Sequence, residues 1–426
     1  MSVRLTIEGV RCFATPQQAI VRPLTLLVGE NSAGKTTFLA LCETVSSMLE
    51  GYSQHTSFNE PPFSPGAFEQ IASYMGGRAG RVREFSLAAD FEDASVRAVF
   101  ASEAEQPTMK SWHFEYGPRK MMVERNQDGG IRIEFRSLSK RAAITLPREE
   151  DIFGRPGGVP FGALLQYAFR RHSEPFVEAS ESFEIDEQLR RIRQAFGQRP
   201  YAFAPIRASP RRTYEPTGTE PDPEGSHIPM LMARLASQAE PLEWEALQSS
   251  LDRFGSSSGL FQHIDVLRNG KRESDPFQIG IKGTGPFVNL VDVGYGVNQV
   301  LPLLVDSLQR LKVNDLFLVQ QPEVHLHPRA QAELGTFFAS LANKTRRFVV
   351  ETHSEYLLDR VRMEVRSGKH IRAEDVSILY FERDKNGAHI HNIELDSVGS
   401  VVNPPPGYRQ FFLDEELALL GDLPPV

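Results

Sequence analysis

The sequence predicts an α/β protein that carries an antiparallel β subdomain and a mainly helical insert. Near the N-terminus, an apolar run feeds a glycine-rich turn and then a helix. Between residues 84 and 135, short apolar runs alternate with turn residues, which is typical of an antiparallel meander. In the last third of the chain, predicted strands alternate with predicted helices, as in an α/β fold.

The chain is long enough for two or three structural units. It has 426 residues, of which 40% are hydrophobic and 24% charged, the balance of an ordinary folded protein. We divide it into an N-terminal lobe at 1–136, the insert at 137–256 and a C-terminal lobe at 257–426. The formal charge of -8 disfavours a general nucleic-acid coat protein but leaves room for a local basic groove.

Cysteine usage and the N-terminus predict a cytosolic protein. The two cysteines, Cys12 and Cys42, cannot build a disulfide framework, and so few suit a reducing compartment. Met1 to Glu8 alternates charged and apolar residues, unlike a signal peptide. No apolar run approaches the roughly 20 residues needed to cross a bilayer, so we expect no membrane association.

The N-terminal lobe begins with two predicted strands, Val3–Ile7 and Leu24–Val28. A helix is predicted from Lys35 to about Leu49, and the Ser-, Pro- and Asn-rich stretch Glu50–Gly66 is predicted as loop. The meander is expected to use five runs, which are Phe85–Phe91, Val96–Phe100, Trp112–Tyr116, Met121–Glu124 and Ile131–Phe135.

The insert is predicted as helical because Phe161–Arg171 and Phe183–Phe196 carry apolar residues at three- and four-residue spacing. Within it, Glu215–Gly225 is rich in Pro, Gly and Glu and is predicted as a linker or mobile loop. The C-terminal lobe is predicted to hold helices at Val297–Leu311 and Ala330–Leu341, strands at Asp315–Val319 and Phe348–Glu351, and a hairpin of Val376–Glu382 with Ala388–Leu395.

A phosphate-binding loop is the strongest motif. It reads Gly29-Glu30-Asn31-Ser32-Ala33-Gly34-Lys35-Thr36, which matches G-x-x-x-x-G-K-[ST] between a predicted strand and a predicted helix. Glycines let the backbone wrap phosphates, so that N–H groups point inward beside a helix N-terminus. Lys35 would neutralise the phosphates of ATP, the Thr36 hydroxyl would bind Mg²⁺, and Thr37 is counted with the nucleotide-binding residues of the loop. A chance glycine turn before a buried helix explains this context poorly.

Three further segments are weak motifs when taken one at a time. An apolar strand ends in Gln320-Gln321-Pro322-Glu323 and is followed by His325-Leu326-His327-Pro328. A second strand ends in Thr352-His353-Ser354, and Asp292–Gln299 is a glycine-rich turn that enters an apolar helix. Loop-shaping histidines, a core histidine and a simple turn would explain them separately. Their joint order downstream of a phosphate loop makes these separate explanations improbable.

In this order the motifs resemble the RecF/SMC/OLD-like branch of ABC ATPases, in which E-E-P-E-x-H-L-H-P or E-Q-P-E-x-H-L-H-P precedes T-H-S. Val3–Phe13 resembles the opening strand of that branch. Pro205-Ile206-Arg207 with Pro210-Arg211-Arg212 resembles a G-P-L-R-x-x-P-R-R segment of bacterial members. The likeness covers both ends of the chain and this central patch, but not most of Ser137–Arg199.

The resemblance implies an ABC-type P-loop ATPase head whose N- and C-terminal lobes fold together. Asp292–Gln299 would be the signature segment, which caps the γ-phosphate held by a second subunit. His353 would be the switch histidine that senses this phosphate. Gln70 would be the Q-loop glutamine, and Arg11 would lie over the nucleotide base or sugar, although an exposed arginine explains Arg11 equally well. The signature residues implied are Gly294, Gly296, Asn298 and Gln299.

Two departures from the family pattern concern catalysis. The signature lacks Leu-Ser-Gly-Gly, which leaves its contact with the partner's phosphate unassigned. Gln320, grouped with Thr36 and Gln70 as the Mg²⁺ site, stands where the metal-associated carboxylate belongs. Gln321 stands where a catalytic glutamate often lies, and only Glu323 keeps its charge. We therefore expect ATP binding with slow hydrolysis. An engineered replacement of glutamate at Gln320 is the favoured explanation, with natural variation as the alternative.

The leading functional expectation is an ATP-driven switch, in which two copies close head to head around two ATP molecules. OLD-type nucleases add a Toprim domain, but only about seventy residues follow His353. The resemblance thus points to a stand-alone ATPase that controls a separately encoded effector, as in bacterial phage defence. An inactive ATPase with ATP as a structural ligand is another hypothesis. A RecF-like DNA clamp is the main alternative, with a basic path from Arg78/Arg81/Arg83, Arg207/Arg211/Arg212 and Lys344/Arg346/Arg347.

Overall fold

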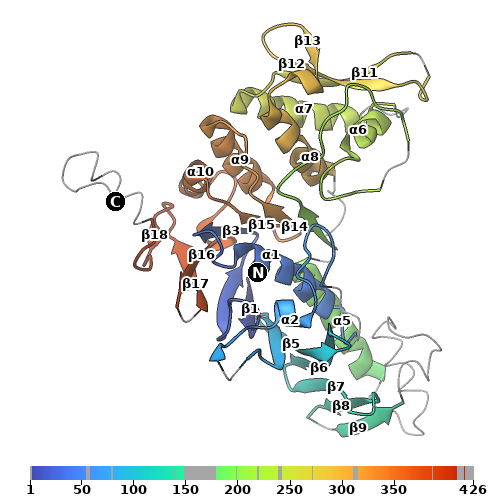
Figure 1. The fold of residues 1–426 in the computed structure, drawn as a ribbon, viewed down its shortest axis with the longest axis vertical. Helices are drawn as coiled ribbons and strands as arrows, with labels where there is room; N and C mark the ends of the chain where they lie inside the picture. Colours follow the sequence, from blue (N-terminus) through green and yellow to red (C-terminus); the bar gives the residue numbers. More distant parts are fainter. Residues whose placement is uncertain are drawn as a thin grey trace.

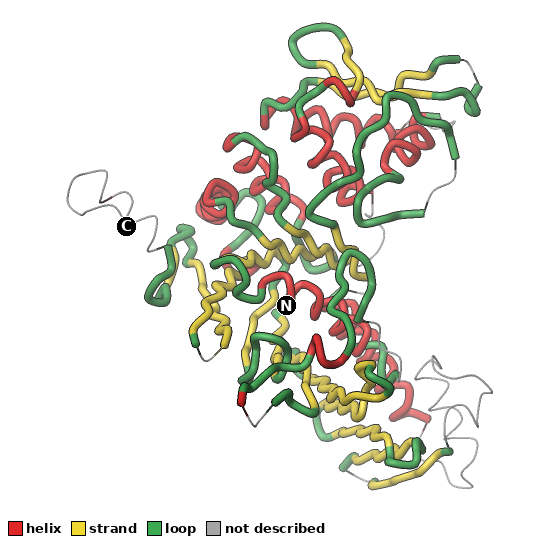
Figure 2. The backbone as a smooth tube through the Cα atoms, in the orientation of Figure 1, coloured by secondary structure: helices red, strands yellow, loops and turns green. Residues whose placement is uncertain are grey.

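The computed structural model describes residues 2–53, 58–77, 80–138, 140–147, 179–197, 199–217, 220–237, 242–270, 272–309, 315–385, 387–409 and residue 417. In Figure 1 the N-terminal strands β4 to β9 lie at one end of the molecule, the strands β11 to β13 at the other, and a central sheet between them. Figure 2 shows the same order, with strands in yellow and helices in red.

The central sheet has seven strands and is built from both ends of the chain, in the order β10-β14-β15-β3-β16-β17-β18. The strands from β10 to β16 are parallel, and β17 and β18 continue the sheet in antiparallel fashion. Because parallel strands end at one edge, the residues that follow β3, β14 and β15 meet there. The strands are β3 (Leu24–Gly29), β10 (Arg199–Phe203), β14 (Asp315–Gln320), β15 (Arg346–Glu351), β16 (Val376–Asp384), β17 (Gly387–Leu395) and β18 (Val401–Val402).

Both faces of the central sheet are covered, which explains why its strands read as continuous apolar runs. All six residues of β14 are buried, and alternate side chains belong to different hydrophobic clusters, as Phe317 and Leu318 show. Helix α1 (Lys35–Met48) covers one face. The other face is covered by α8 (Tyr295–Gln309), α9 (Pro328–Leu341) and α10 (Glu355–Ser367).

The N-terminal residues form a second sheet of eight strands, in the order β2-β1-β4-β5-β6-β7-β8-β9. From β4 to β9 it is an antiparallel meander, so the predicted subdomain is confirmed. Its buried face packs against α1 and α5 (Ala179–Phe196). The strands are β1 (Val3–Glu8), β2 (Gln17–Val21), β4 (Glu84–Asp90), β5 (Ala94–Glu103), β6 (Gln106–Tyr116), β7 (Arg119–Arg125), β8 (Ile131–Arg136) and β9 (Arg141–Leu146).

The end of the molecule opposite the meander contains helices α6 (Ile228–Ala236) and α7 (Leu242–Ser258) beneath a small antiparallel sheet (Figure 1). Its strands, which the sequence did not predict, are β11 (His263–Arg268), β12 (Phe277–Lys282) and β13 (Phe287–Asn289). A signal was present in β12, where Phe277, Ile279 and Ile281 are buried at a two-residue period, but the run is only six residues long. A 3-10 turn at Leu290–Asp292 then leads into α8.

The range 137–256, predicted as a mainly helical insert, also contributes β9 and β10. β10 pairs with β14 as a strand of the central sheet, a contact that local periodicity cannot reveal. Segment 220–225 is not a free linker, because a Cβ on Gly225 would lie 2.4 Å from Pro302 of α8. The predicted helix Phe161–Arg171 lies outside the described residues. Among the described helices, none is long and apolar enough to span a membrane.

Candidate nucleotide-binding site

The phosphate-binding loop connects β3 to α1 and requires glycine at two positions. Gly29 has a φ of 131°, and a Cβ there would lie 2.2 Å from the carbonyl oxygen of Phe381 in β16. Gly34 has a φ of 104°, and its Cβ would lie 2.6 Å from Phe13 Cζ and 2.8 Å from Cys12 Sγ. Only glycine adopts such φ values without strain. Neighbouring strands and turns therefore shape the loop.

The loop holds Lys35 through its own carbonyl groups. Lys35 Nζ donates to the carbonyl oxygen of Gly29 at 2.9 Å and to that of Glu30 at 2.6 Å. An ammonium group has three donors, so one N–H remains for a phosphate oxygen. Burial lowers the pKa of Lys35, while the charges of Glu351 and Glu30 act in the opposite direction.

A cavity of about 750 Å³ lies over the loop and has an excess of positive charge. Four basic side chains line it, from Arg11, Lys35, Arg81 and Arg383, against the single acid Glu351. Such a charge excess at a helix N-terminus suits a triphosphate. Gly29, Glu30 and Ala33 of the predicted loop do not line it. The remaining lining residues are Cys12, Asn31, Ser32, Gly34, Thr36, Thr37, Gln70, Ala72, Tyr74 and Gln321.

Arg11 ties the loop to the short helix α2 (Phe68–Ile71). Its guanidinium donates to Thr37 Oγ1 at 3.3 Å and to the carbonyl oxygens of Pro65 at 2.9 Å and Gln70 at 3.3 Å. The Gln70 side-chain oxygen accepts a hydrogen bond from the Ala67 N–H at 3.0 Å. Both residues lie at the cavity, as expected from the sequence, but the Gln70 amide oxygen caps its own helix in this state.

The segment after β14 presents an amide to the cavity. Gln320 is buried and does not line the cavity, whereas Gln321 does. Gln321 has a φ of 40°, and its N–H donates to the Glu351 carbonyl oxygen at 2.8 Å. Glu323 faces the next loop, where its Oε1 accepts a hydrogen bond from the His353 N–H at 2.6 Å. Burial raises the pKa of the Glu323 carboxyl. The Glu323 side chain therefore holds the loop around His353, the predicted switch histidine, and does not face the cavity. We call this loop, Thr352–Ser354, the switch loop.

Glu351 is a site residue that sequence reasoning missed. Its Oε2 accepts a hydrogen bond from Thr36 Oγ1 at 2.8 Å. Burial raises the pKa of Glu351, opposed by the Thr36 hydrogen bond, the Lys35 charge and the Gln321 side chain. A signal was available, because Glu351 is the last residue of a predicted apolar strand and directly precedes the T-H-S motif. The end of a parallel strand is where a ligand-facing carboxylate belongs.

The switch loop is fixed on both sides of His353. Before it, the Thr352 N–H donates to the Leu27 carbonyl oxygen of β3 at 3.1 Å. After it, Ser354 Oγ caps α10 by accepting a hydrogen bond from the Leu357 N–H at 3.1 Å. Burial lowers the pKa of His353, and the charge of Lys35 lowers it further. The imidazole is therefore neutral near neutral pH.

The signature segment lies at the start of α8 and is only partly accessible. Asn298 and Gln299 are buried, and the Asn298 side-chain N–H donates to the Ala208 carbonyl oxygen at 3.0 Å. Gly296 is buried as well, since a Cβ there would lie 2.9 Å from the His325 carbonyl oxygen. At Gly294 a Cβ would meet open space. Asp292, Gly294 and Tyr295 are therefore the exposed residues of the segment.

Arg212 fixes the entry to the signature. Its Nη1 donates to Asp292 Oδ2 at 2.8 Å and its Nη2 to Asp292 Oδ1 at 2.6 Å. The Arg212 carbonyl oxygen accepts a hydrogen bond from the Asn289 side chain at 2.8 Å. The central P-R-R segment is thus packed beside the signature turn, which no motif spacing could show.

The two histidines after β14 shape the loop that follows. His327 caps α9, and its Nδ1 accepts a hydrogen bond from the Arg329 N–H at 3.4 Å, with Pro328 as the first helical residue. His325 has a φ of 64° and its ring lies 5.0 Å from that of Tyr295. Within the described ranges, no group of three or more His, Cys, Asp or Glu residues is placed to hold a metal ion.

The predicted basic path for DNA is interrupted, because three of its arginines are buried and a fourth is paired with an acid. Arg207, Arg346 and Arg347 are buried, and Arg212 is paired with Asp292. Arg78 lies outside the described residues. Five described residues of the three clusters are exposed, namely Arg81, Arg83, Arg211, Arg212 and Lys344.

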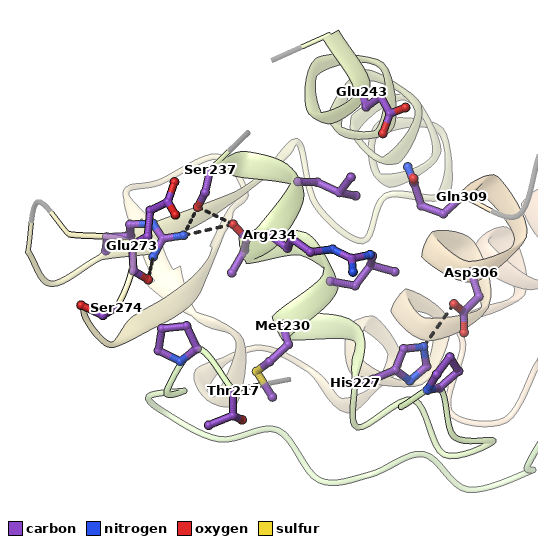
Figure 3. Close-up of a pocket in the computed structure, with 16 residues that line it drawn as sticks. Thr217, His227, Met230, Arg234, Ser237, Glu243, Glu273, Ser274, Asp306 and Gln309 are labelled. Carbon is purple, nitrogen blue, oxygen red and sulfur yellow. Dashed lines mark hydrogen bonds and ion pairs between the residues drawn. The ribbon is translucent and has the colours of Figure 1, made fainter. Parts of the chain in front are cut away.

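A second cavity, of about 980 Å³, lies beside α6 and the end of α8 (Figure 3). His227 and Asp306 bond one another across it, with Nε2 and Oδ1 3.2 Å apart, and the Tyr201 hydroxyl donates to Asp306 at 2.7 Å. Its charged residues are of both signs, as Arg234 and Glu243 show. None of the predicted site residues lines it, and its bonded polar groups hold α6 against α8.

The glycine loop between β3 and α1, the parallel sheet with β15 beside β3, and the two lobes have the arrangement that the sequence motifs led us to expect of an ABC-type P-loop ATPase head. Residues 170–359 match a family model described as "AAA domain, putative AbiEii toxin, Type IV TA system". This match covers less than half of the chain and includes the signature, β14 and the T-H-S motif, but not the phosphate loop. No curated protein matches the chain.

Two solved structures similar to the chain are SMC head domains. The SMC head domain from Thermotoga maritima is 12% identical, covers 92% of this chain and 98% of its own, and has a TM-score of 0.41. A head domain with an extended coiled coil bound to the C-terminal domain of ScpA, derived from Pyrococcus furiosus, is 11% identical, covers 92% of this chain and 97% of its own, and has a TM-score of 0.42. These likenesses say nothing of what this chain binds.

Proposed function

We propose that this chain binds and hydrolyses ATP as a switch, in which two copies close head to head around the nucleotide and open after hydrolysis. The observation that supports this is the position of the signature. Its exposed residues, Asp292, Gly294 and Tyr295, are not among the described residues that line the phosphate-loop cavity. The chain thus holds a phosphate loop without a signature segment of its own beside it, and a second copy would supply one.

Within this proposal, each residue of the loop has a task. Lys35 and the N–H groups at the start of α1 bind the phosphates. Thr36 would hold Mg²⁺, which would supply positive charge to the phosphates. The cavity over the loop fits a triphosphate ligand, because Arg11, Lys35, Arg81 and Arg383 outnumber the one acid in its described lining. Gln321 lines the cavity but cannot accept a proton from water, so we expect slow hydrolysis.

We further propose that closure acts on a separately encoded effector, in bacterial phage defence. The description of the matching family model, a putative toxin of a type IV toxin–antitoxin system, supports a two-protein system of this kind. Purification with co-eluting proteins identified would name the effector. Recovery of full biological function from the isolated chain would contradict the proposal.

Light scattering with ATP and Mg²⁺ tests the switch. We expect the mass to double with ATP and to stay monomeric with ADP, because the γ-phosphate is the group that the partner's signature would contact. Gly294→Trp should block this association, since a side chain there points into open space and leaves the monomer intact. Gly294→Ala is the matched control. Gly296 is unsuitable, because a side chain there would collide within its own chain.

An equal mass with ATP and ADP for the unmutated protein would refute the nucleotide-dependent switch. Salt-dependent binding of duplex DNA by the ATP-bound form would instead favour the RecF-like clamp.

A further inference from the structure

We propose that Glu351 supplies the carboxylate that supports Mg²⁺ in this chain, in place of the acid that β14 lacks. This assignment rests on the proposed function, since it concerns the metal that accompanies ATP. Thr36 would be the second protein ligand, and Glu323 and Gln320 would not take part.

The strand order places Glu351 closer to the phosphate loop than any residue of β14. β15 lies between β3 and β14, and Glu351 is in register with Leu27 of β3 on one side and Gln320 of β14 on the other. An acid at Gln320 would reach the loop across β15. Glu351 belongs to the strand that is hydrogen-bonded directly to β3.

The contact with Thr36 has a separation that suits a shared metal ion. Thr36 Oγ1 and Glu351 Oε2 are 2.8 Å apart. Mg²⁺ binds oxygen at about 2.0–2.1 Å in octahedral geometry, so neighbouring ligand oxygens lie about 2.9 Å apart. The ion could therefore be bound by both oxygens without moving either backbone. Phosphate oxygens and waters usually supply the other Mg²⁺ ligands, so no cluster of acids is needed.

Glu351 makes no direct ion pair with a cation among the described residues, although the charge of Lys35 acts on it from nearby. Glu351 is only 4% exposed. Its bonding partners, the Thr36 hydroxyl and the Gln321 side chain, are neutral. The nearby Lys35 ammonium is bonded to two carbonyl oxygens. A buried carboxylate without an ion pair is costly, and a divalent cation would offset that cost.

The other acids near the loop are directed elsewhere. Glu323 accepts the His353 N–H and does not line the cavity. Glu30 is exposed to solvent and does not line it either. Among the described residues that line the cavity, Glu351 is the single acid.

Binding of Mn²⁺, followed by electron paramagnetic resonance in the presence of ATP, tests this assignment without relying on turnover. Glu351→Gln and Glu351→Ala should weaken Mn²⁺ binding at least about tenfold, as expected when a charged partner is lost. ATP affinity measured with EDTA should stay equal or increase, because a negative charge beside the phosphates is removed. Glu69→Gln, an equal charge change at an exposed site on α2, should alter neither quantity.

A double variant adds a check that a merely structural role would not satisfy. Gln321→Glu should restore more Mn²⁺ affinity in the Glu351→Gln background than it adds to the unmutated protein, because Gln321 lines the same cavity and its side chain is hydrogen-bonded to Glu351. An equal or larger gain in the unmutated background would overturn the assignment.

Unchanged Mn²⁺ affinity in either Glu351 variant, with a normal melting transition, would also overturn it. If ATP still drives dimers in that case, the proposed function stands and only the role of Glu351 is wrong. Failure of the unmutated protein to bind ATP would refute the proposed function itself.

Discussion

Replacing Lys35 with alanine tests the nucleotide site most directly. Two of the three Lys35 donors are used on the carbonyl oxygens of Gly29 and Glu30, which orients the ammonium and leaves one N–H for a phosphate. A hydrogen bond to a charged group contributes about 1.5–3 kcal/mol. The dissociation constant for ATP should therefore rise about 10- to 150-fold. Three other basic side chains line the cavity, so binding should weaken and not vanish.

Isothermal titration of ATP into both proteins measures this difference. Lys369→Ala is the matched control, because Lys369 is an exposed lysine just beyond the end of α10 and should leave ATP affinity unchanged. Melting curves without nucleotide show whether the loop still folds once the two carbonyl groups lose their donor. Equal affinities for the unmutated protein and a folded Lys35→Ala variant would refute the assignment of this loop as the phosphate site.

Three further predictions concern packing, charge and the signature. Gly34→Val should lower the free energy of unfolding by about 2–4 kcal/mol in denaturant titrations, because Gly34 has a positive φ and a side chain there would collide with its neighbours. A loss below about 1 kcal/mol would mean that the loop relaxes. Burial raises the pKa of Glu43 to about 7, so its protonated form is favoured in the folded state and stability falls as pH rises from about 4.5 to 7. Glu43→Gln should accordingly stabilise the protein at pH 8 and not at pH 4, and equal shifts at both would contradict this. Arg212→Ala, which releases Asp292, should weaken ATP-driven association in light scattering while the melting temperature stays unchanged; unaltered association would remove Arg212 from signature positioning.

Local patterns were sufficient to predict the elements that carry the phosphate loop. β3, α1, β14 and β15 have clear apolar runs or helical spacing, and the loop between β3 and α1 has a motif whose glycines need positive φ values. Such features depend on neighbours in sequence, so the sequence alone specifies them.

The order of strands in the central sheet could not be predicted from local sequence patterns. For this reason Glu351 was not recognised as a site residue. The motif comparison directed attention to Gln320. This residue is directly opposite Glu351 in the sheet, but its strand, β14, is separated from β3 by β15. The place of β15 between β3 and β14 depends on pairing across more than 300 residues, since Glu351 and Thr36 are 315 residues apart. The same limitation hid β10, whose only strand partner in the described sheet is β14.

The signature was only partly predictable. The glycine-rich turn was found, but its four named residues were expected to act together. The helical period of α8 instead turns Gly296, Asn298 and Gln299 inward and leaves Gly294 exposed. A single exposed glycine gives a narrower target for mutation than the motif suggested.

The pairing of β3 has a consequence for how the protein is made. Within the described sheet, β3 is hydrogen-bonded only to β15 and β16, which begin at residues 346 and 376. At typical synthesis rates, roughly 20–70 s separate the appearance of β3 from that of its second neighbour. Throughout that interval a nascent chain exposes an unpaired apolar strand, which is a template for aggregation. ATP therefore cannot assist early folding, because the site it binds is completed only when nearly the whole chain has left the ribosome.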